Sequence, residues 1–348
     1  MRWENLSAPP DEGHPDGSAP ATPPLPLALP GAVARTFDAP GFAGMTFYEV
    51  QAKSIINKVP GASRVPFQWT INPYRGCSHA CVYCFARNTH TYLDLDAGAD
   101  FDRKVIVKVN AGELVRRELA APRWRGAHIA MGTNVDCYQR AEGRYRLMPP
   151  IIEALRDFAN PFSILTKGTL ILRDLPLLRQ AAEVTRVSVS YSVGFVDEAL
   201  WRTVEPGTPS PRRRLDAVRA LTEAGFEVGV LMAPILPGLS DTDESIEATV
   251  SAVAAAGAAS VTPMALHLRP GAREWYAHWL AREFPHLVPR YRELYRSGAH
   301  APQAYQRELT ARVRIAARRH GLHRGERGDN RRLRAPEAPP AAEQLSLL

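Results

Sequence analysis

Residues 72–87 read NPYRGCSHACVYCFAR and contain three of the four cysteines in this chain of 348 residues. Cys77, Cys81 and Cys84 follow the spacing C-x3-C-x2-C, in a segment that comes directly after an apolar run. Three thiolates on one short loop can converge on a single metal centre, whereas scattered structural cysteines cannot. The spacing therefore predicts a metal-binding loop.

Two kinds of metal centre are compatible with these residues. A tetrahedral zinc site would need a fourth ligand, for which His79 or Cys137 could serve, but zinc ligands usually form two separated pairs. A 4Fe–4S cluster held by three thiolates instead keeps one iron without a protein ligand, where a small molecule can chelate. His79 is explained more simply as a loop residue than as a ligand.

The composition is that of a globular protein and excludes several classes. Hydrophobic residues make up 45% and charged residues 23% of the chain. There is no run of about eighteen apolar residues, so no membrane span is expected. The first residues, MRWENLSAPPDEGHPDG, carry acids and prolines where a signal peptide needs a basic and then an apolar segment. We therefore expect a cytoplasmic protein, and four cysteines are too few for a disulfide scaffold.

The positive charge is concentrated near the C-terminus. Residues 312–334 contain nine arginines against two acids, and this excess of seven equals the net charge of +7 of the whole chain. Such a segment could contact phosphates. It could equally be the solvated end of a helix in a chain that uses arginine in place of lysine.

Short apolar runs alternate with amphipathic helical patterns between residues 66 and 290. The runs are rich in β-branched and aromatic residues, as strands are, and lie at residues 66–72, 127–133, 162–167, 186–192, 226–234 and 259–266. Because strands that alternate with helices form parallel βα units, this order predicts an α/β protein with a barrel or part of one. Two of the helical patterns end in Gly225 and Gly257, as helices often do.

Four segments follow from these patterns. Residues 1–45 contain nine prolines and no apolar periodicity, which predicts a disordered or loosely attached leader. Residues 46–290 are the expected core domain, and residues 291–325 a C-terminal helical extension. Residues 326–348 are expected to be a disordered tail.

The cysteine segment, with Tyr83 just before its last cysteine, resembles the motif of the radical S-adenosylmethionine (SAM) superfamily. Further segments resemble the spore-photoproduct-lyase-like branch of that superfamily, often labelled DNA repair photolyase. They are GTNVDCYQ (132–139), SILTKGTL (163–170), VEPGTPSPRRRLDAVRALTEAG (204–225) and APILPGLSD (233–241). The resemblance covers about residues 46–300 and implies a partial (β/α)6 TIM-like barrel.

The resemblance also implies the cofactors and the reaction. Cys77, Cys81 and Cys84 would bind a 4Fe–4S cluster, whose open iron would take the amino and carboxylate groups of SAM. One electron from the reduced cluster would break a carbon–sulfur bond, giving methionine and a 5′-deoxyadenosyl radical that abstracts hydrogen from the substrate. The protein would bind, orient and shield these groups, because the cofactors carry the difficult chemistry.

Some candidate SAM contacts lie close to the ends of the first two predicted strands. In the family, the aromatic residue at the position of Tyr83 packs near the SAM adenine, although this side chain could simply anchor the loop. Gly132, Thr133 and Asn134 match a family element that contacts the methionine part of SAM. The alternative for these three residues is an ordinary turn.

Other candidates follow later strands. Lys167 ends the third predicted strand, and its compact ammonium suits a SAM carboxylate, unless it is a surface lysine. Ser190 and Arg214 are further candidates for the SAM pocket, although either could be structural. Cys137 is the candidate catalytic residue, because spore photoproduct lyases return a hydrogen atom from a cysteine. It does not match their motif position, so it could also be an incidental thiol.

The resemblance further implies partners and leaves other functions open. The expected partners are a damaged or modified nucleic acid and an electron donor such as a flavodoxin or ferredoxin, while the oligomeric state is not indicated. A second enzyme hypothesis keeps the radical chemistry but applies it to a small molecule or a protein. A third class is non-catalytic, either a zinc-stabilised nucleic-acid-binding module or an Fe–S carrier, although a carrier cluster normally has four thiolates.

Overall fold

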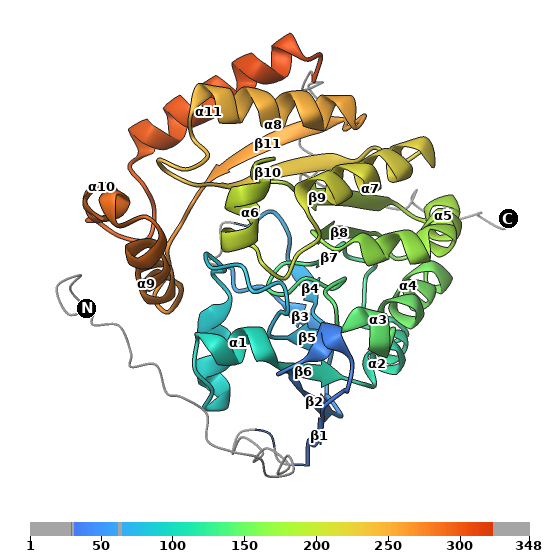
Figure 1. Cartoon of the computed structure of the whole chain (residues 1–348). Helices are drawn as coiled ribbons and strands as arrows, with labels where there is room; N and C mark the ends of the chain where they lie inside the picture. Colours follow the sequence, from blue (N-terminus) through green and yellow to red (C-terminus); the bar gives the residue numbers. More distant parts are fainter. Residues whose placement is uncertain (1–28, 30, 62–64, 323–348) are drawn as a thin grey trace, which may run out of the picture.

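The computed structural model describes residues 29, 31–61 and 65–322. The larger of its two sheets has seven strands in the order β11-β10-β9-β8-β7-β4-β3 (Figure 1). Its strands are β3 (Ile56–Lys58), β4 (Trp69–Ile71), β7 (Ile129–Met131), β8 (Phe162–Thr166), β9 (Val187–Ser192), β10 (Gly229–Ile235) and β11 (Ser260–Ala265). From β4 to β11 the strands lie side by side in chain order and parallel to one another. β3 pairs antiparallel with β4, so β3 and β11 are the two edges of an open sheet. The predicted partial (β/α)6 barrel is confirmed.

Each parallel strand falls on one of the apolar runs of the sequence, and only β10 extends beyond its run, by one residue. The burial along β8 shows why the runs are apolar. Phe162, Ile164 and Thr166 are buried, and the residues between them are half-buried. Both faces of a parallel strand are covered in such a fold, so the side chains on both faces must tolerate burial.

Helices follow the parallel strands, and most of them cover the outer face of the sheet (Figure 1). They are α2 (Ala111–Leu119), α3 (Glu142–Tyr145), α4 (Met148–Asp157), the 3-10 helix η4 (Thr169–Asp174), α5 (Leu175–Val184), α6 (Glu198–Val204), α7 (Pro211–Glu223) and α8 (Asp243–Ala255). At the start of α7, the Ser210 hydroxyl accepts a hydrogen bond from the backbone N–H of Arg213. Gly225 and Gly257 follow α7 and α8 with φ of 94° and 78°, as the sequence predicted.

A second sheet, which the sequence analysis did not predict, lies beside the cysteine segment. Its order is β1-β2-β6-β5, and its strands are β1 (Val33–Arg35), β2 (Thr46–Val50), β5 (Tyr74–Arg75) and β6 (Lys104–Lys108). β1 pairs with β2 from Val33 opposite Glu49 to Arg35 opposite Phe47, and the short 3-10 helix η2 (Pro40–Phe42) lies between them. The boundary of the predicted leader at residue 45 is therefore wrong, because a three-residue strand is too short to show periodicity. Residues 1–28 of that leader lie outside the described residues.

The C-terminal part contains α9 (Ala272–Glu283), the 3-10 helix η5 (Pro285–Leu287), α10 (Val288–Leu294) and α11 (Gln303–Arg319). The boundary predicted between residues 290 and 291 falls inside α10. Helix α11 lies along α8 and packs against β11, so it covers the last strand of the barrel (Figure 1). The predicted tail, residues 326–348, lies outside the described residues.

The arginines of α11 show what the described part of the basic segment does. Arg312 Nε lies 2.7 Å from Asp243 Oδ1, and Arg319 Nη2 lies 2.7 Å from Glu247 Oε2. Both acids belong to α8, so these two arginines attach α11 to its neighbour. Within the described residues, no helix is long and apolar enough to cross a membrane.

Candidate active site

The three cysteines lie on a loop between β5 and the 3-10 helix η3 (Arg87–Leu93), beyond the carboxyl end of β4. Cys77 and Cys81 are buried, Cys84 is half-buried, and all three are free thiols. The loop is tightly wound: the Ala80 N–H donates to the Cys77 carbonyl at 3.2 Å, and the Cys84 N–H donates to the Cys81 carbonyl at 3.1 Å. The local turns therefore keep the three thiols within one compact segment.

Side chains from outside the loop fix its backbone. Gln139 accepts from the Ser78 N–H at 2.8 Å and donates to the Gly76 carbonyl at 2.9 Å. On the other side, the guanidinium of Arg87 donates to the Cys81 carbonyl at 3.0 Å and pairs with Asp102, which lies in α1 (Ala99–Arg103), at 2.9 Å. Gln139 and Arg87 are both fully buried, so the loop is held from two sides by buried polar side chains that hydrogen-bond to its backbone.

The end of α6 and the segment that follows it also form backbone hydrogen bonds with the cysteine loop. The Val82 N–H donates to the Val204 carbonyl at 3.0 Å, and the Gly207 N–H donates to the His79 carbonyl at 3.1 Å. A Cβ atom at residue 207 would collide with the Ser78 carbonyl oxygen. A glycine is needed here because the two backbones approach so closely.

The electrostatics of the thiols suit a cluster. Burial is the main cause that raises the pKa of all three thiols. For Cys77 and Cys81 a nearby carboxylate and neighbouring cysteines act in the same direction, and the pKa of Cys81 is raised to about 12. Thiolates in such a place need a positive partner, which a metal centre supplies. In the described part of the chain, no three His, Cys, Asp or Glu side chains converge as ligands of one metal ion would. In a 4Fe–4S cluster, by contrast, the thiolates bind different irons. The donor set therefore fits the cluster.

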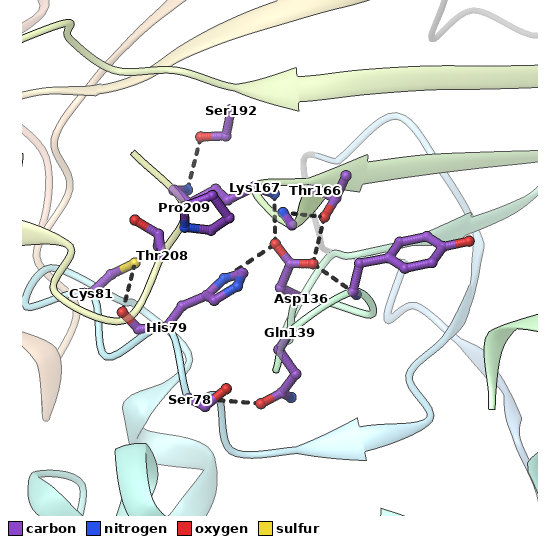
Figure 2. Close-up of polar contacts among 12 residues, drawn as sticks. Ser78, His79, Cys81, Asp136, Gln139, Thr166, Lys167, Ser192, Thr208 and Pro209 are labelled. Carbon is purple, nitrogen blue, oxygen red and sulfur yellow. Dashed lines mark hydrogen bonds and ion pairs between the residues drawn. The ribbon is translucent and has the colours of Figure 1, made fainter. Parts of the chain in front are cut away.

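Lys167 lies beside this loop, just beyond the end of β8. Its Nζ donates to Ser192 Oγ at 2.8 Å (Figure 2). The same Nζ lies 5.7 Å from the centre of the Tyr83 ring. Its charge lowers the pKa of Cys81 and Cys84, against the larger effect of burial. The structure thus brings Lys167 and Tyr83 together, while Ser190 lies two residues before Ser192 on the same strand. Ser192, which the sequence analysis missed, is the serine that contacts Lys167.

A buried ion pair between Glu205 and Arg214 holds the hydroxyl of Tyr83. Glu205 accepts hydrogen bonds from the Tyr83 hydroxyl and from the Arg214 guanidinium, and Glu205 and Arg214 are each 1% exposed. Burial alone would raise the pKa of Glu205, but Arg214 and Lys167 outweigh it and hold the pKa below its usual value. Arg214 also donates to the carbonyls of Ser192 and Pro209, at 3.0 and 2.9 Å. Its donors are mostly committed to the protein, so its position favours a structural role.

Asp136 is a second buried acid that the sequence analysis missed. Its carboxylate accepts from Thr166 Oγ1 at 2.6 Å and from the Lys167 N–H at 2.7 Å, and it lies 3.3 Å from His79 Nδ1 (Figure 2). Burial would raise the pKa of Asp136, but His79 and these hydrogen bonds outweigh it and lower the pKa to about 2. Asp136 therefore connects the cysteine loop to the end of β8. The signal that the sequence offered for Asp136 was its place within GTNVDCYQ, one of the segments on which the family resemblance rests.

The predicted element after β7, residues 132–134, is a tight turn that contains a buried hydroxyl without a partner in the described part of the chain. Gly132 has a φ of 80°, and a Cβ atom there would collide with the Leu165 carbonyl. Thr133 Oγ1 is buried without a hydrogen-bond partner in the described structure, and Asn134 is exposed. A buried hydroxyl without a partner is costly, so Thr133 has capacity for a polar ligand.

Cys137 occupies a different environment from the other cysteines. It is 0% exposed and belongs to the hydrophobic core, and burial raises its pKa well above the usual value. The His79 ring is already paired with the Asp136 carboxylate. Neither residue is presented as a fourth metal ligand, and the position of Cys137 favours an incidental core thiol over a hydrogen donor.

Comparison with known proteins is consistent with this geometry. Residues 71–252 match the family model described as the radical SAM superfamily. An uncharacterized protein of Mycobacterium tuberculosis is 50% identical over 320 residues, which cover 91% of this chain and 92% of that protein. An uncharacterized protein of Methanocaldococcus jannaschii is 30% identical over 203 residues, 58% of this chain and 72% of that protein.

Solved structures show the same fold. Spore photoproduct lyase complexed with dinucleoside spore photoproduct superimposes with a TM-score of 0.58 and 15% identity, covering 79% of each chain. A variant of that enzyme with bound AdoMet and the same dinucleoside gives a TM-score of 0.59 and 16% identity, covering 78% of each chain.

Proposed function

The chain belongs to the radical SAM superfamily, and we propose that it holds the cluster of that family through Cys77, Cys81 and Cys84. The family's cofactors are a 4Fe–4S cluster and SAM. When bound, they supply the one-electron cleavage of SAM that starts hydrogen abstraction from a substrate. The observation that carries the assignment is the compact loop of three buried or half-buried thiols at the carboxyl ends of the barrel strands.

The residues around the loop define where SAM would bind. The ammonium of Lys167, held by Ser192 above the Tyr83 ring, would pair with the SAM carboxylate. Thr133, whose hydroxyl lacks a partner, and its neighbours Gly132 and Asn134 would contact the methionine part of SAM. Tyr83 would lie near the adenine, with its hydroxyl already held by Glu205.

We further propose that the substrate is a damaged or modified nucleic acid and that the reaction is lyase-like. The proposal is supported by the similarity over most of the chain to spore photoproduct lyase, which has been solved with a dinucleoside photoproduct. An electron donor such as a flavodoxin or ferredoxin would reduce the cluster in the cytoplasm. The alternative substrates are a small molecule or a protein.

The cofactor assignment is tested with single alanine variants after anaerobic reconstitution. Replacing Cys77, Cys81 or Cys84 should abolish the visible absorbance of the cluster, because two thiolates of this loop cannot hold a cube. The matched control is Cys137→Ala, which should keep the iron content of the wild type. Loss of iron in this control would indicate a fourth protein ligand and contradict the open iron.

The activity is tested by following SAM. The reduced, reconstituted protein should form 5′-deoxyadenosine slowly from SAM alone, and faster when the proper substrate is added. Irradiated DNA, undamaged DNA and a cell extract of small molecules can be compared in this assay. Acceleration by the small-molecule extract alone would favour the alternative substrate class, and no 5′-deoxyadenosine from a fully loaded protein would contradict the enzyme assignment.

A further inference from the structure

The chain that follows β11 returns to the cysteine loop and places three rings next to one another. His267 forms a short antiparallel bridge with His300, and the Leu268 N–H donates to the Ala299 carbonyl at 2.7 Å. The His267 ring lies 5.4 Å from the ring of Phe85, the residue after Cys84, and 5.5 Å from the His300 ring. A row of rings therefore extends from the cysteine loop to the protein surface.

In this row of rings, His300 is the outer end and is exposed to solvent. The rings of His267 and His300 are stacked, with an angle of 19° between their planes. His267 and Phe85 are half-buried, while His300 is exposed. His267 stays neutral at ordinary pH, because burial, helped by Arg269 and His300, lowers its pKa to about 4. An uncharged inner ring thus supports an exposed outer ring, to which another flat group can be added.

A free cation accompanies the rings. The guanidinium of Arg269 lies 5.2 Å from the centre of the Phe85 ring, and Arg269 is exposed. In the described structure it has no carboxylate partner, whereas Arg312 and Arg319 on the basic helix α11 are paired with acids of α8. Arg269 is therefore a cation beside both the cysteine loop and the rings that can take a phosphate.

We propose that Phe85, His267, His300 and Arg269 form a binding site for a single-stranded segment of nucleic acid, with an unstacked base on His300 and a phosphate on Arg269. Stacked rings beside a cation are the means by which proteins hold single strands. This inference rests on the proposed function, since it supplies the place where a nucleic-acid substrate enters. It locates the contact at the barrel mouth, beside the cysteine loop.

The test uses the reconstituted full-length protein and measures the fluorescence anisotropy of two labelled probes. One is a short thymidine oligonucleotide, and the other is an abasic strand of the same length. His300→Ala should weaken binding of the thymidine strand about five- to a hundredfold, the effect of losing one stacked base, and leave the abasic strand unaffected. His300→Phe should bind like the wild type, because it restores a ring without a titratable group.

The role of Arg269 has its own readout. Arg269→Gln should weaken binding of both strands and reduce the slope of log K against log salt by about 0.7, as expected for one lost phosphate contact to a single strand. The matched controls are His286→Ala, an exposed histidine outside the row, and Arg186→Gln, an exposed arginine directly before the amino end of β9, away from the carboxyl ends of the strands where the cysteine loop lies. Both controls should bind like the wild type, and the cluster absorbance verifies that every variant is folded.

Two results would overturn the inference. In the first, His300→Ala binds the thymidine strand as the wild type does, or loses both strands equally. In the second, the wild type cleaves SAM but binds neither strand, and the proposed radical SAM chemistry then stands while this site fails. A protein that binds both strands as described but forms no 5′-deoxyadenosine would instead support this site and contradict the proposed function.

Discussion

At the scale of single residues, the site depends on polar groups whose partners come from distant parts of the sequence. Lys167 is held by Ser192, which is 25 positions away, and Asp136 is held by Thr166 and the Lys167 backbone, 30 and 31 positions away. The sequence indicated Lys167 because lysine is rare in this chain. It assigned no role to Ser192 or Asp136, because a serine within a strand and an aspartate in a turn are both common without a function.

The first prediction concerns SAM affinity. Lys167→Ala should raise the dissociation constant of SAM about ten- to a hundredfold, because one charge-assisted hydrogen bond contributes about 1.5–3 kcal/mol. Lys167→Arg should restore only part of the affinity, since the planar fork cannot take up the same geometry. Anaerobic calorimetry measures the binding, with the exposed Lys53→Ala as control. Unchanged affinity in the Lys167→Ala variant would remove Lys167 from the pocket.

The second prediction concerns pH. The pKa of Asp136 in the folded protein, about 2, lies below the value of about 3.9 for an unfolded aspartate, so its ionised form stabilises the fold above about pH 4. This contribution, about 2 kcal/mol, is lost as the pH falls from about 4 to about 2. The difference in unfolding free energy between the wild type and Asp136→Asn should therefore shrink by about this amount over the same range.

Urea unfolding of the cluster-free chain at a series of pH values measures this effect. The control is Asp216→Asn, which removes an exposed carboxylate paired with Arg219 and should change the stability by less than about 1 kcal/mol at every pH. A difference between Asp136→Asn and the wild type that is the same from pH 6 to pH 2 would contradict the assigned ionisation.

At the scale of elements, the cysteine loop is shaped by its neighbours. β5 ties its start to the small sheet, where Tyr74 lies opposite Val107, and the segment after α6 lies directly on its backbone. The loop's own backbone hydrogen bonds form only short turns. Its geometry is therefore a property of several elements packed together, and a change in one of these elements should disturb the metal centre.

The third prediction tests this dependence. In Gly207→Ala the new methyl group would meet backbone atoms of Ser78 and His79, which cannot rotate away. We expect a loss of about 1–3 kcal/mol in stability and a clear decrease in iron bound per chain after reconstitution. The control is Gly143→Ala in α3, where the nearest atom, Leu170 Cδ1, lies at 3.7 Å and alanine favours the helix by up to about 1 kcal/mol. Full iron binding by Gly207→Ala would show that the loop adapts independently.

At the scale of the whole molecule, an open barrel must protect its two edges. β3 pairs with one side of β4, and α11 packs over β11 and along α8 at the other end of the sheet. The buried face of α11 contains Leu309, Val313, Ala316 and Ala317. The C-terminal helix α11 is therefore packed against the barrel through its apolar face, and its charged face is the part that predicted a separate extension.

The fourth prediction separates the two faces of α11. Leu309→Ala should lower the free energy of unfolding by about 2–5 kcal/mol, because Leu309 is 2% exposed and its removal leaves a cavity. Ile315→Ala on the same helix should change it by less than about 0.5 kcal/mol, because Ile315 is 55% exposed. Denaturant unfolding measures both variants. Equal effects of the two substitutions would contradict the packing of α11 against the barrel.

From the amino-acid sequence alone, one can predict the order of the parallel strands, the loop that carries the cysteines and the family to which the chain belongs. These features are local: an apolar run, a glycine after a helix and the spacing of three thiols are each visible within a few residues. Other features are visible only in the folded chain: Glu205 and Arg214 support Tyr83, Cys137 is a core residue, and β1 and α11 belong to the fold. The physical reason is that a buried polar group is stable only with its partner, and in this chain the partner comes from another element.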